Sequence, residues 1–73
     1  MFEQVKGIIE KYTEVETITP ESELGADLGL SSFDLVAVVA DFEDTFGLEV
    51  PDRDLVSFVT VRDILDYIQA HQA

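Results

Sequence analysis

The chain has 73 residues and no cysteine, and sixteen acidic against four basic side chains give it a net charge of -12. This length predicts one small domain over residues 1–73, and a hydrophobic fraction of 47% argues against disorder. The negative charge disfavours nucleic acid and anionic membranes as partners, and no segment is apolar enough for membrane insertion. We therefore expect a monomeric, cytoplasmic protein that meets basic partner surfaces.

The N-terminal segment carries apolar residues at helical spacing from Phe2 to Tyr12, which predicts a first helix over roughly residues 2–13. A long polar connection follows, in which Thr19-Pro20-Glu21-Ser22 predicts a single turn with proline at its first position. Apolar residues within this connection are expected to hold it against the body of the domain: Leu24, Leu28 and Leu30.

The second predicted helix begins at two adjacent serines. Ser31 with Asp34 matches a capping box, which places Ser32 at the first helical position. The apolar pattern runs to Phe46, and Gly47 is the expected stop. On a helical wheel the predicted core face consists of Leu35, Val38, Val39, Phe42 and Phe46.

Two further helices are predicted after the second one. Asp52, after the break at Val50-Pro51, is placed to cap a short helix over Arg53–Ser57. Thr60 with Asp63 forms another capping box ahead of a regular apolar stripe. The sequence thus predicts an all-α fold: a small four-helix bundle with three longer helices, one short third helix and a long loop between the first two helices.

The second helix has another apolar stripe besides its core face, formed by Phe33, Val36 and Ala40. The acidic residues around it are Asp34, Asp41, Glu43 and Asp44. An apolar strip rimmed by acids is suited to docking in a groove with a basic border. The alternative is that the helix packs centrally and both stripes belong to the core.

Three blocks of the sequence, in order, resemble the acyl carrier protein family over nearly the whole chain. Leu28-Gly29-Leu30-Ser31-Ser32-Phe33-Asp34 matches the family's Leu-Gly approach and its Asp-Ser-Leu triplet at the head of the second helix. The stretch from Phe42 to Asp52 resembles the acidic end of that helix and the Ile-Pro-Asp loop, and Thr60 to Ile68 resembles the last helix. The chain resembles a discrete bacterial-type acyl carrier protein with Ser-Ser-Phe in place of Asp-Ser-Leu.

This resemblance implies thiol chemistry in a chain without cysteine. By it, Ser32 accepts a 4′-phosphopantetheine arm from coenzyme A, and the arm carries acyl groups as thioesters between enzymes of fatty-acid or polyketide-type biosynthesis. The implied partners are a phosphopantetheinyl transferase and acyl-processing enzymes with basic docking surfaces. A helix start is also a favourable place for a phosphate, and Ser31 is expected to cap the helix.

The chain departs from the family pattern in the charge of the second helix, and other functions also stay open. Ser31 stands where the family has aspartate, and Ala37 replaces an acid often found on the exposed half of the second helix. Both changes remove negative charge from the face that partners contact, which suggests a dedicated set of partners. A D-alanyl or other aminoacyl carrier, or an unmodified acidic helical protein-interaction module, remains an alternative.

No catalytic or metal-binding residue is predicted, and the chain is not expected to be an enzyme. His71 lies near the C-terminus without a nucleophile to activate, and an EF-hand loop counted from Asp41 fails because Phe46 replaces the glycine at its sixth position. One interpretation is that a cavity between the helices holds the acyl chain and is lined by Val38, Phe42, Val59, Ile64 and Leu65. The alternative is that these residues pack in the ordinary core.

Overall fold

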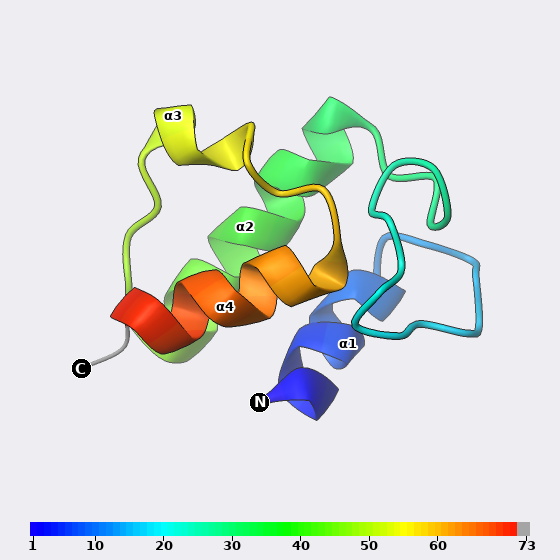
Figure 1. Cartoon of the computed structure of the whole chain (residues 1–73), viewed down its shortest axis with the longest axis horizontal. Helices are drawn as coiled ribbons and strands as arrows, with labels where there is room; N and C mark the ends of the chain where they lie inside the picture. The colour runs from blue at the N-terminus through cyan, green and yellow to red at the C-terminus, as the bar shows by residue number, and fades with distance from the viewer. Residues whose placement is uncertain (72–73) are drawn as a thin grey trace.

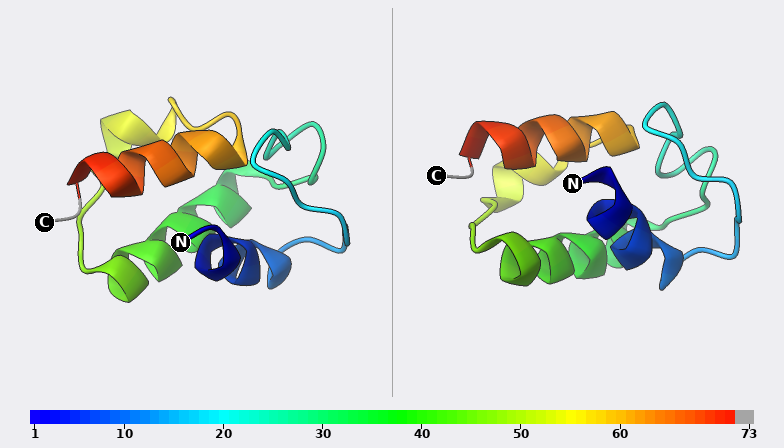
Figure 2. Two further views of the ribbon diagram at one scale, coloured as in Figure 1. Left: turned by 60° about the horizontal axis from the view of Figure 1, so that its bottom comes forward. Right: turned by 90° about the horizontal axis from the view of Figure 1, so that it is seen from below.

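Within residues 1–71, which the computed structural model describes, the chain forms four helices and no strand, as the sequence predicts (Figure 1). In chain order they are α1 (Phe2–Glu10), α2 (Ser32–Phe46), α3 (Asp52–Leu55) and α4 (Val61–His71). Seen from two further sides, α2 and α4 lie on opposite sides of the domain, and α1 lies beside α2 (Figure 2). No helix in this part of the chain is long and apolar enough to cross a membrane.

The core lies where the inward faces of α1, α2 and α4 meet. Apolar burial there supplies the main driving force for folding. Phe58, which follows α3, is buried and packs edge-on against Phe42 of α2 with ring centroids 6.1 Å apart. α3 itself contains no buried residue. The largest fully buried side chains are Phe42, Ile9, Ile64, Ile68, Val5, Val38 and Val61.

Both ends of α2 are set by local sequence signals. Ser31 Oγ accepts a hydrogen bond from the backbone N–H of Asp34 at 3.1 Å, and Asp34 Oδ2 accepts one from the N–H of Ser31 at 3.1 Å. This reciprocal pair is the predicted capping box. At the other end Gly47 has φ +66°, a left-handed conformation that favours glycine and ends the helix.

The predicted first helix, over residues 2–13, is longer than the observed one. α1 stops at Glu10, because the N–H groups of Lys11 and Tyr12 turn back to the carbonyls of Ile8 and Ile9 in a tighter final turn.

The short helix also differs from its prediction. α3 starts at Asp52 and ends at Leu55, and the extended Pro51 occupies the cap position without any side-chain cap bond. Asp52 is therefore the first helical residue and not the cap.

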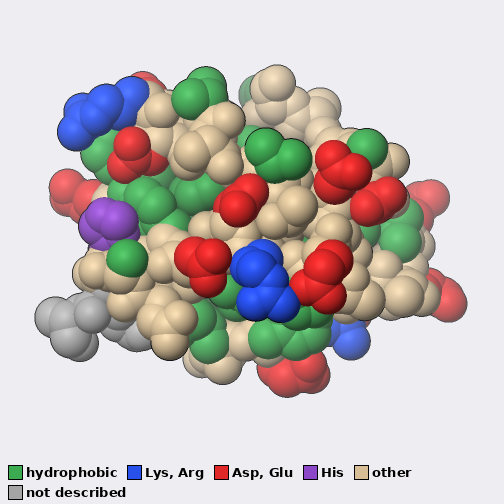
Figure 3. All heavy atoms as spheres, in the orientation of Figure 1, with side chains coloured by type: hydrophobic (Ala, Val, Ile, Leu, Met, Phe, Trp, Pro, Cys, Tyr) green, Lys and Arg blue, Asp and Glu red, His purple; other side chains and the backbone are tan. Residues whose placement is uncertain are grey.

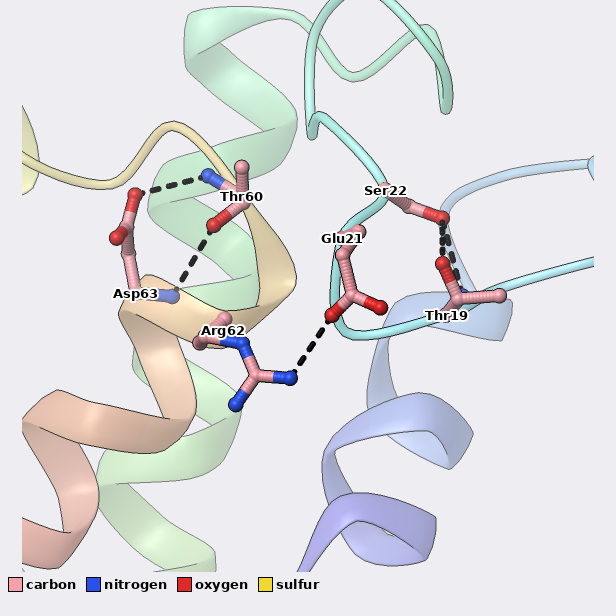
Figure 4. Close-up of polar contacts among 6 residues, drawn as sticks. All are labelled: Thr19, Glu21, Ser22, Thr60, Arg62 and Asp63. Atoms are coloured by element: carbon pink, nitrogen blue, oxygen red, sulfur yellow. Dashed lines mark hydrogen bonds and ion pairs between the residues drawn. The ribbon is translucent and has the colours of Figure 1, made fainter.

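The long loop between α1 and α2 is fastened to the segment that leads into α4. The N–H of Leu24 donates to the carbonyl of Val59 at 2.8 Å, and the N–H of Val61 donates to the carbonyl of Ser22 at 3.0 Å. The predicted turn is present: the N–H of Ser22 donates to the carbonyl of Thr19 at 3.0 Å. The N–H of Thr19 also donates to Ser22 Oγ at 3.0 Å (Figure 4). The three predicted loop anchors, Leu24, Leu28 and Leu30, are all buried.

Candidate functional site

Ser32 is the first residue of α2 and its side chain is exposed to solvent. The neighbouring Ser31 is exposed as well, but its hydroxyl is used in the capping box. The two serines therefore have different roles: one closes the helix end and the other presents a hydroxyl at that end.

The approach to these serines is held by backbone hydrogen bonds. Gly29 has φ +70°, and its N–H donates to the carbonyl of Gly25 at 3.0 Å. The N–H of Leu30 then donates to the carbonyl of Leu24 at 3.0 Å, and both leucine side chains are buried. The serines thus follow a fixed turn whose left-handed residue suits glycine.

The start of α2 offers two free backbone donors. The N–H groups of Ser32 and Phe33 form no hydrogen bond with any other part of residues 1–71. Aligned peptide dipoles add partial positive charge at the same point, which makes a helix N-terminus a favourable place for a phosphate. The exposed Ser32 hydroxyl therefore lies where a phosphate ester would be stabilised.

An open hollow of about 190 Å³ adjoins Ser32. Leu35 and Val36 of α2 line it on one side, and Leu55 of α3 with the following Val56 line it on the other. Its lining is thus largely apolar and suits an aliphatic group beside the serine.

The candidate cavity residues named from the sequence lie elsewhere. Val38, Phe42 and Ile64 are fully buried in the core, which is the packing alternative, whereas Val59 is 53% exposed. Leu65 is half-buried against the core. The sequence pattern could not reveal Leu55 and Val56 as lining residues, because it places a short helix there without fixing which helix its residues face.

The second apolar stripe of α2 lies in solvent and not in the core. Phe33 is 84% exposed and Val36 is 54% exposed, and Ala40 is exposed further along the same stripe. Val56 beside the hollow is 86% exposed. Apolar surface thus surrounds the mouth of the hollow on both α2 and the end of α3, as expected of a contact surface.

The acidic residues predicted to border this stripe have unequal surroundings. Asp34 is used in the capping box, and Asp44 is exposed whereas the other three are partly buried. Glu43 Oε2 accepts a hydrogen bond from the N–H of Val50 at 2.7 Å and so fastens the connection after α2.

Asp41 joins α2 to the end of α1. Its Oδ2 accepts a hydrogen bond from the Tyr12 hydroxyl at 2.9 Å and lies 3.4 Å from Lys11 Nζ. The hydrogen bond to Asp41 and burial both raise the pKa of Tyr12, so the phenol stays neutral and keeps its donor. No local pattern connects these residues, because they are far apart in the sequence.

Comparison with known proteins identifies the family of the chain. Residues 3–68 match the family described as the phosphopantetheine attachment site. The chain is 45% identical over 71 residues to the acyl carrier protein of Thermotoga maritima, which covers 94% of this chain and 88% of that protein. It is also 45% identical over 58 residues to the acyl carrier protein of Syntrophobacter fumaroxidans, with 80% and 72% covered.

This chain belongs to the acyl carrier protein family. The family's cofactor, 4′-phosphopantetheine, combines a phosphate with a long, flexible arm in which methyl and methylene groups alternate with two amides, and the arm ends in a thiol. The start of α2 fits both parts, because N–H groups without a partner in residues 1–71 suit the phosphate, and the hollow lined by Leu35 and Leu55 suits the apolar groups of the arm. Backbone donors and an apolar hollow thus lie next to each other at this helix end.

Proposed function

We propose that Ser32 is the attachment residue for 4′-phosphopantetheine and that the protein is a non-catalytic carrier. The observation that carries this proposal is the position of Ser32, exposed at the start of α2 beside an apolar hollow and two N–H groups that have no partner within residues 1–71. When attached, the cofactor supplies the thiol that the chain lacks, on which acyl groups are held as thioesters between enzymes of fatty-acid or polyketide-type biosynthesis.

The two serines support this assignment by their different environments. The Ser32 hydroxyl is free to take the phosphopantetheinyl group of coenzyme A, with 3′,5′-ADP leaving. The resulting phosphodiester carries a negative charge at the positive end of the helix dipole, within reach of the N–H groups of Ser32 and Phe33. Ser31 holds the helix end in the required conformation through its bond with Asp34.

The exposed stripe of α2 is the proposed docking face for the transferase and for acyl-processing enzymes. Phe33, Val36 and Ala40 supply its apolar centre and Asp44 its most accessible charge. Asp34, Asp41 and Glu43 add negative potential while they are held by internal hydrogen bonds. A partner surface with an apolar centre and a basic border complements this face.

The attachment site is tested by incubating the unmodified protein with coenzyme A and a phosphopantetheinyl transferase, followed by mass spectrometry. The wild type should gain one phosphopantetheinyl group, and Ser32→Ala should gain none. Ser31→Ala is the matched control and should still be modified, because it keeps the acceptor hydroxyl. A wild type without any gain would instead identify an unmodified interaction module.

The docking face is tested with two valines of nearly equal exposure. Val36→Ser on the stripe should raise the KM of the transferase for this protein by about tenfold, the effect of losing roughly 1.4 kcal/mol of contact. Val59→Ser is the control, because Val59 is 53% exposed against 54% for Val36 but does not line the hollow. Equal KM values for the two variants would exclude this face as the contact surface.

A further inference from the structure

α3 contributes to the site although, among its residues, only the partly buried Leu55 is an apolar residue packed against the core. It has four residues and none of them is buried. Nevertheless, Leu55 at its end and the following Val56 form the wall of the hollow opposite α2. A helix this short is not stable by itself, so contacts with other elements must fix its position.

One side-chain hydrogen bond joins α3 to α4. The hydroxyl of Tyr67 in α4 donates to Oδ2 of Asp54 in α3 at 2.9 Å. The bond is partly buried. Water therefore competes less with it than with an exposed hydrogen bond. Burial first, and then the bond to Asp54, raise the pKa of Tyr67, so the phenol remains a neutral donor.

The ring of Tyr67 is itself held on two sides. It meets Phe58 edge-on, with centroids 5.3 Å apart and planes at 88°, and it stacks on His71 at 4.0 Å and 16°. His71 Nδ1 also lies 2.9 Å from the carbonyl of Tyr67. Figure 3 shows the histidine beside apolar side chains between α3 and the end of α4. These contacts direct the hydroxyl toward Asp54.

We propose that Tyr67 is a positioning residue for the hollow beside Ser32, acting through its hydrogen bond to Asp54. The bond fixes α3 against α4 and thereby sets the distance between the α3 wall and the α2 wall of the hollow. Loss of the bond lets α3 move away from α2 and makes the apolar surface beside Ser32 less defined. The identity of the group that occupies the hollow rests on the proposed function, whereas the attachment of α3 to α4 does not.

Amide hydrogen exchange of the unmodified protein, measured by NMR, tests the attachment. The N–H groups of Ser57 and Phe58 donate to the carbonyls of Asp54 and Leu55 and report on the α3 turn. Tyr67→Phe keeps the ring and removes the donor, so their exchange should become about 3- to 10-fold faster, the effect of one partly buried hydrogen bond. Unprotected Ser57 and Phe58 amides in the wild type, or unchanged exchange in the variant, would overturn the proposal.

Tyr12→Phe is a matched control, because Tyr12 donates to Asp41 at the same 2.9 Å but at the junction of α1 and α2. It should accelerate exchange at residues 11 and 12 and leave Ser57 and Phe58 unchanged. Tyr67→Phe should show the reverse pattern. Equal acceleration at both places in either variant would indicate general loss of stability and would contradict a specific attachment.

The acceptor is tested by two substitutions of Asp54. Asp54→Asn keeps an oxygen that can accept from Tyr67, so exchange at Ser57 and Phe58 should remain close to that of the wild type. Asp54→Ala should match Tyr67→Phe, and combining the two should cause no further acceleration. A further acceleration in the double variant would show that the two residues act separately.

The link to the hollow is tested on the modified protein with an octanoyl group on the cofactor thiol. Loading should shift the methyl resonances of Leu55 and Val56, and Tyr67→Phe should reduce these shifts at least twofold relative to those of Leu35 and Val36. Equal shifts in the wild type and in Tyr67→Phe would overturn the proposed effect of Tyr67 on the hollow. If the protein is not modified at all, the proposed function fails, whereas the exchange result still decides whether Tyr67 holds α3.

Discussion

The starts of α2 and α4 use the same capping box but differ in the partners of their next two backbone N–H groups. In α4, Thr60 Oγ1 accepts from the N–H of Asp63 at 3.3 Å, and Asp63 Oδ2 accepts from the N–H of Thr60 at 3.0 Å. The N–H groups of Val61 and Arg62 donate to the loop between α1 and α2. An ion pair from Arg62 to Glu21 at 2.8 Å adds to this contact (Figure 4).

At the start of α2 the corresponding N–H groups, of Ser32 and Phe33, have no partner within residues 1–71. The side chains differ in the same way, since Val61 is fully buried and Ser32 is exposed. The start of α4 therefore connects this helix to the loop between α1 and α2, whereas the start of α2 makes no such connection within residues 1–71. Backbone N–H groups at a helix start can bind an anionic ligand when no other part of the fold accepts their hydrogen bonds.

The largest difference in stability between the two helix starts is expected at the first helical position, which is Val61 in α4 and Ser32 in α2. Val61→Ala should lower the free energy of unfolding by about 2–3 kcal/mol, through lost apolar burial and the space left behind. That is a large part of the ~3–5 kcal/mol available to so small a core. Ser32→Ala should change the free energy of unfolding by less than about 0.5 kcal/mol, as is usual for an exposed site. Urea unfolding followed by circular dichroism measures both, and similar losses would contradict the comparison.

The capping residues should behave alike. Ser31→Ala and Thr60→Ala should each lower the free energy of unfolding by about 1 kcal/mol, because each leaves a helix N–H without its side-chain acceptor. Thr60→Ser keeps the hydroxyl and serves as the control, with a smaller loss. If Ser31→Ala had no effect in urea unfolding, water would replace its cap at this exposed end.

A smaller contrast is expected at the second helical position. Arg62→Ala removes an exposed ion pair and should lower the free energy of unfolding by about 0.2–1 kcal/mol at low salt. The loss should shrink in high salt, since salt screens exposed charges. Phe33→Ala should leave stability nearly unchanged at both salt concentrations because Phe33 is 84% exposed. A salt-independent loss in Arg62→Ala would mean that packing of its side chain is responsible.

The smallest expected effect is the pH dependence of stability that comes from Asp63, the third residue of α4. Hydrogen bonds from the backbone N–H groups of Thr60 and Val59 lower the pKa of Asp63 from its usual 3.8. The carboxylate therefore adds stability above that value, and this contribution is lost as the pH falls through the lowered pKa.

Asp63→Asn should accordingly be less stable than the wild type at neutral pH, and the difference should shrink as the pH falls below 3.8. Thermal unfolding at a series of pH values measures it. Asp66→Asn is the charge control, because Asp66 is an exposed residue of the same helix. A difference between Asp63→Asn and the wild type that persists at low pH would show that the carboxylate charge is not the cause.

The sequence by itself determined the features that depend on neighbouring residues. The two capping boxes, the stop at Gly47 and the place of Ser32 at a helix start all rest on residues within one helical turn of each other. Local hydrogen bonds and backbone preferences operate at that range, so these features could be predicted. The bounds of α1 and α3 were less accurate, because short helix ends depend on small differences among competing hydrogen bonds.

Only the tertiary structure decided how distant segments meet. It placed Phe33 and Val36 in solvent, where the sequence left open whether they belong to the core. It also brought Leu55 beside Ser32 and paired Tyr67 with Asp54 across two helices. These arrangements depend on how whole helices pack around one core, and helical periodicity gives the face of a residue but not the neighbour that this face meets.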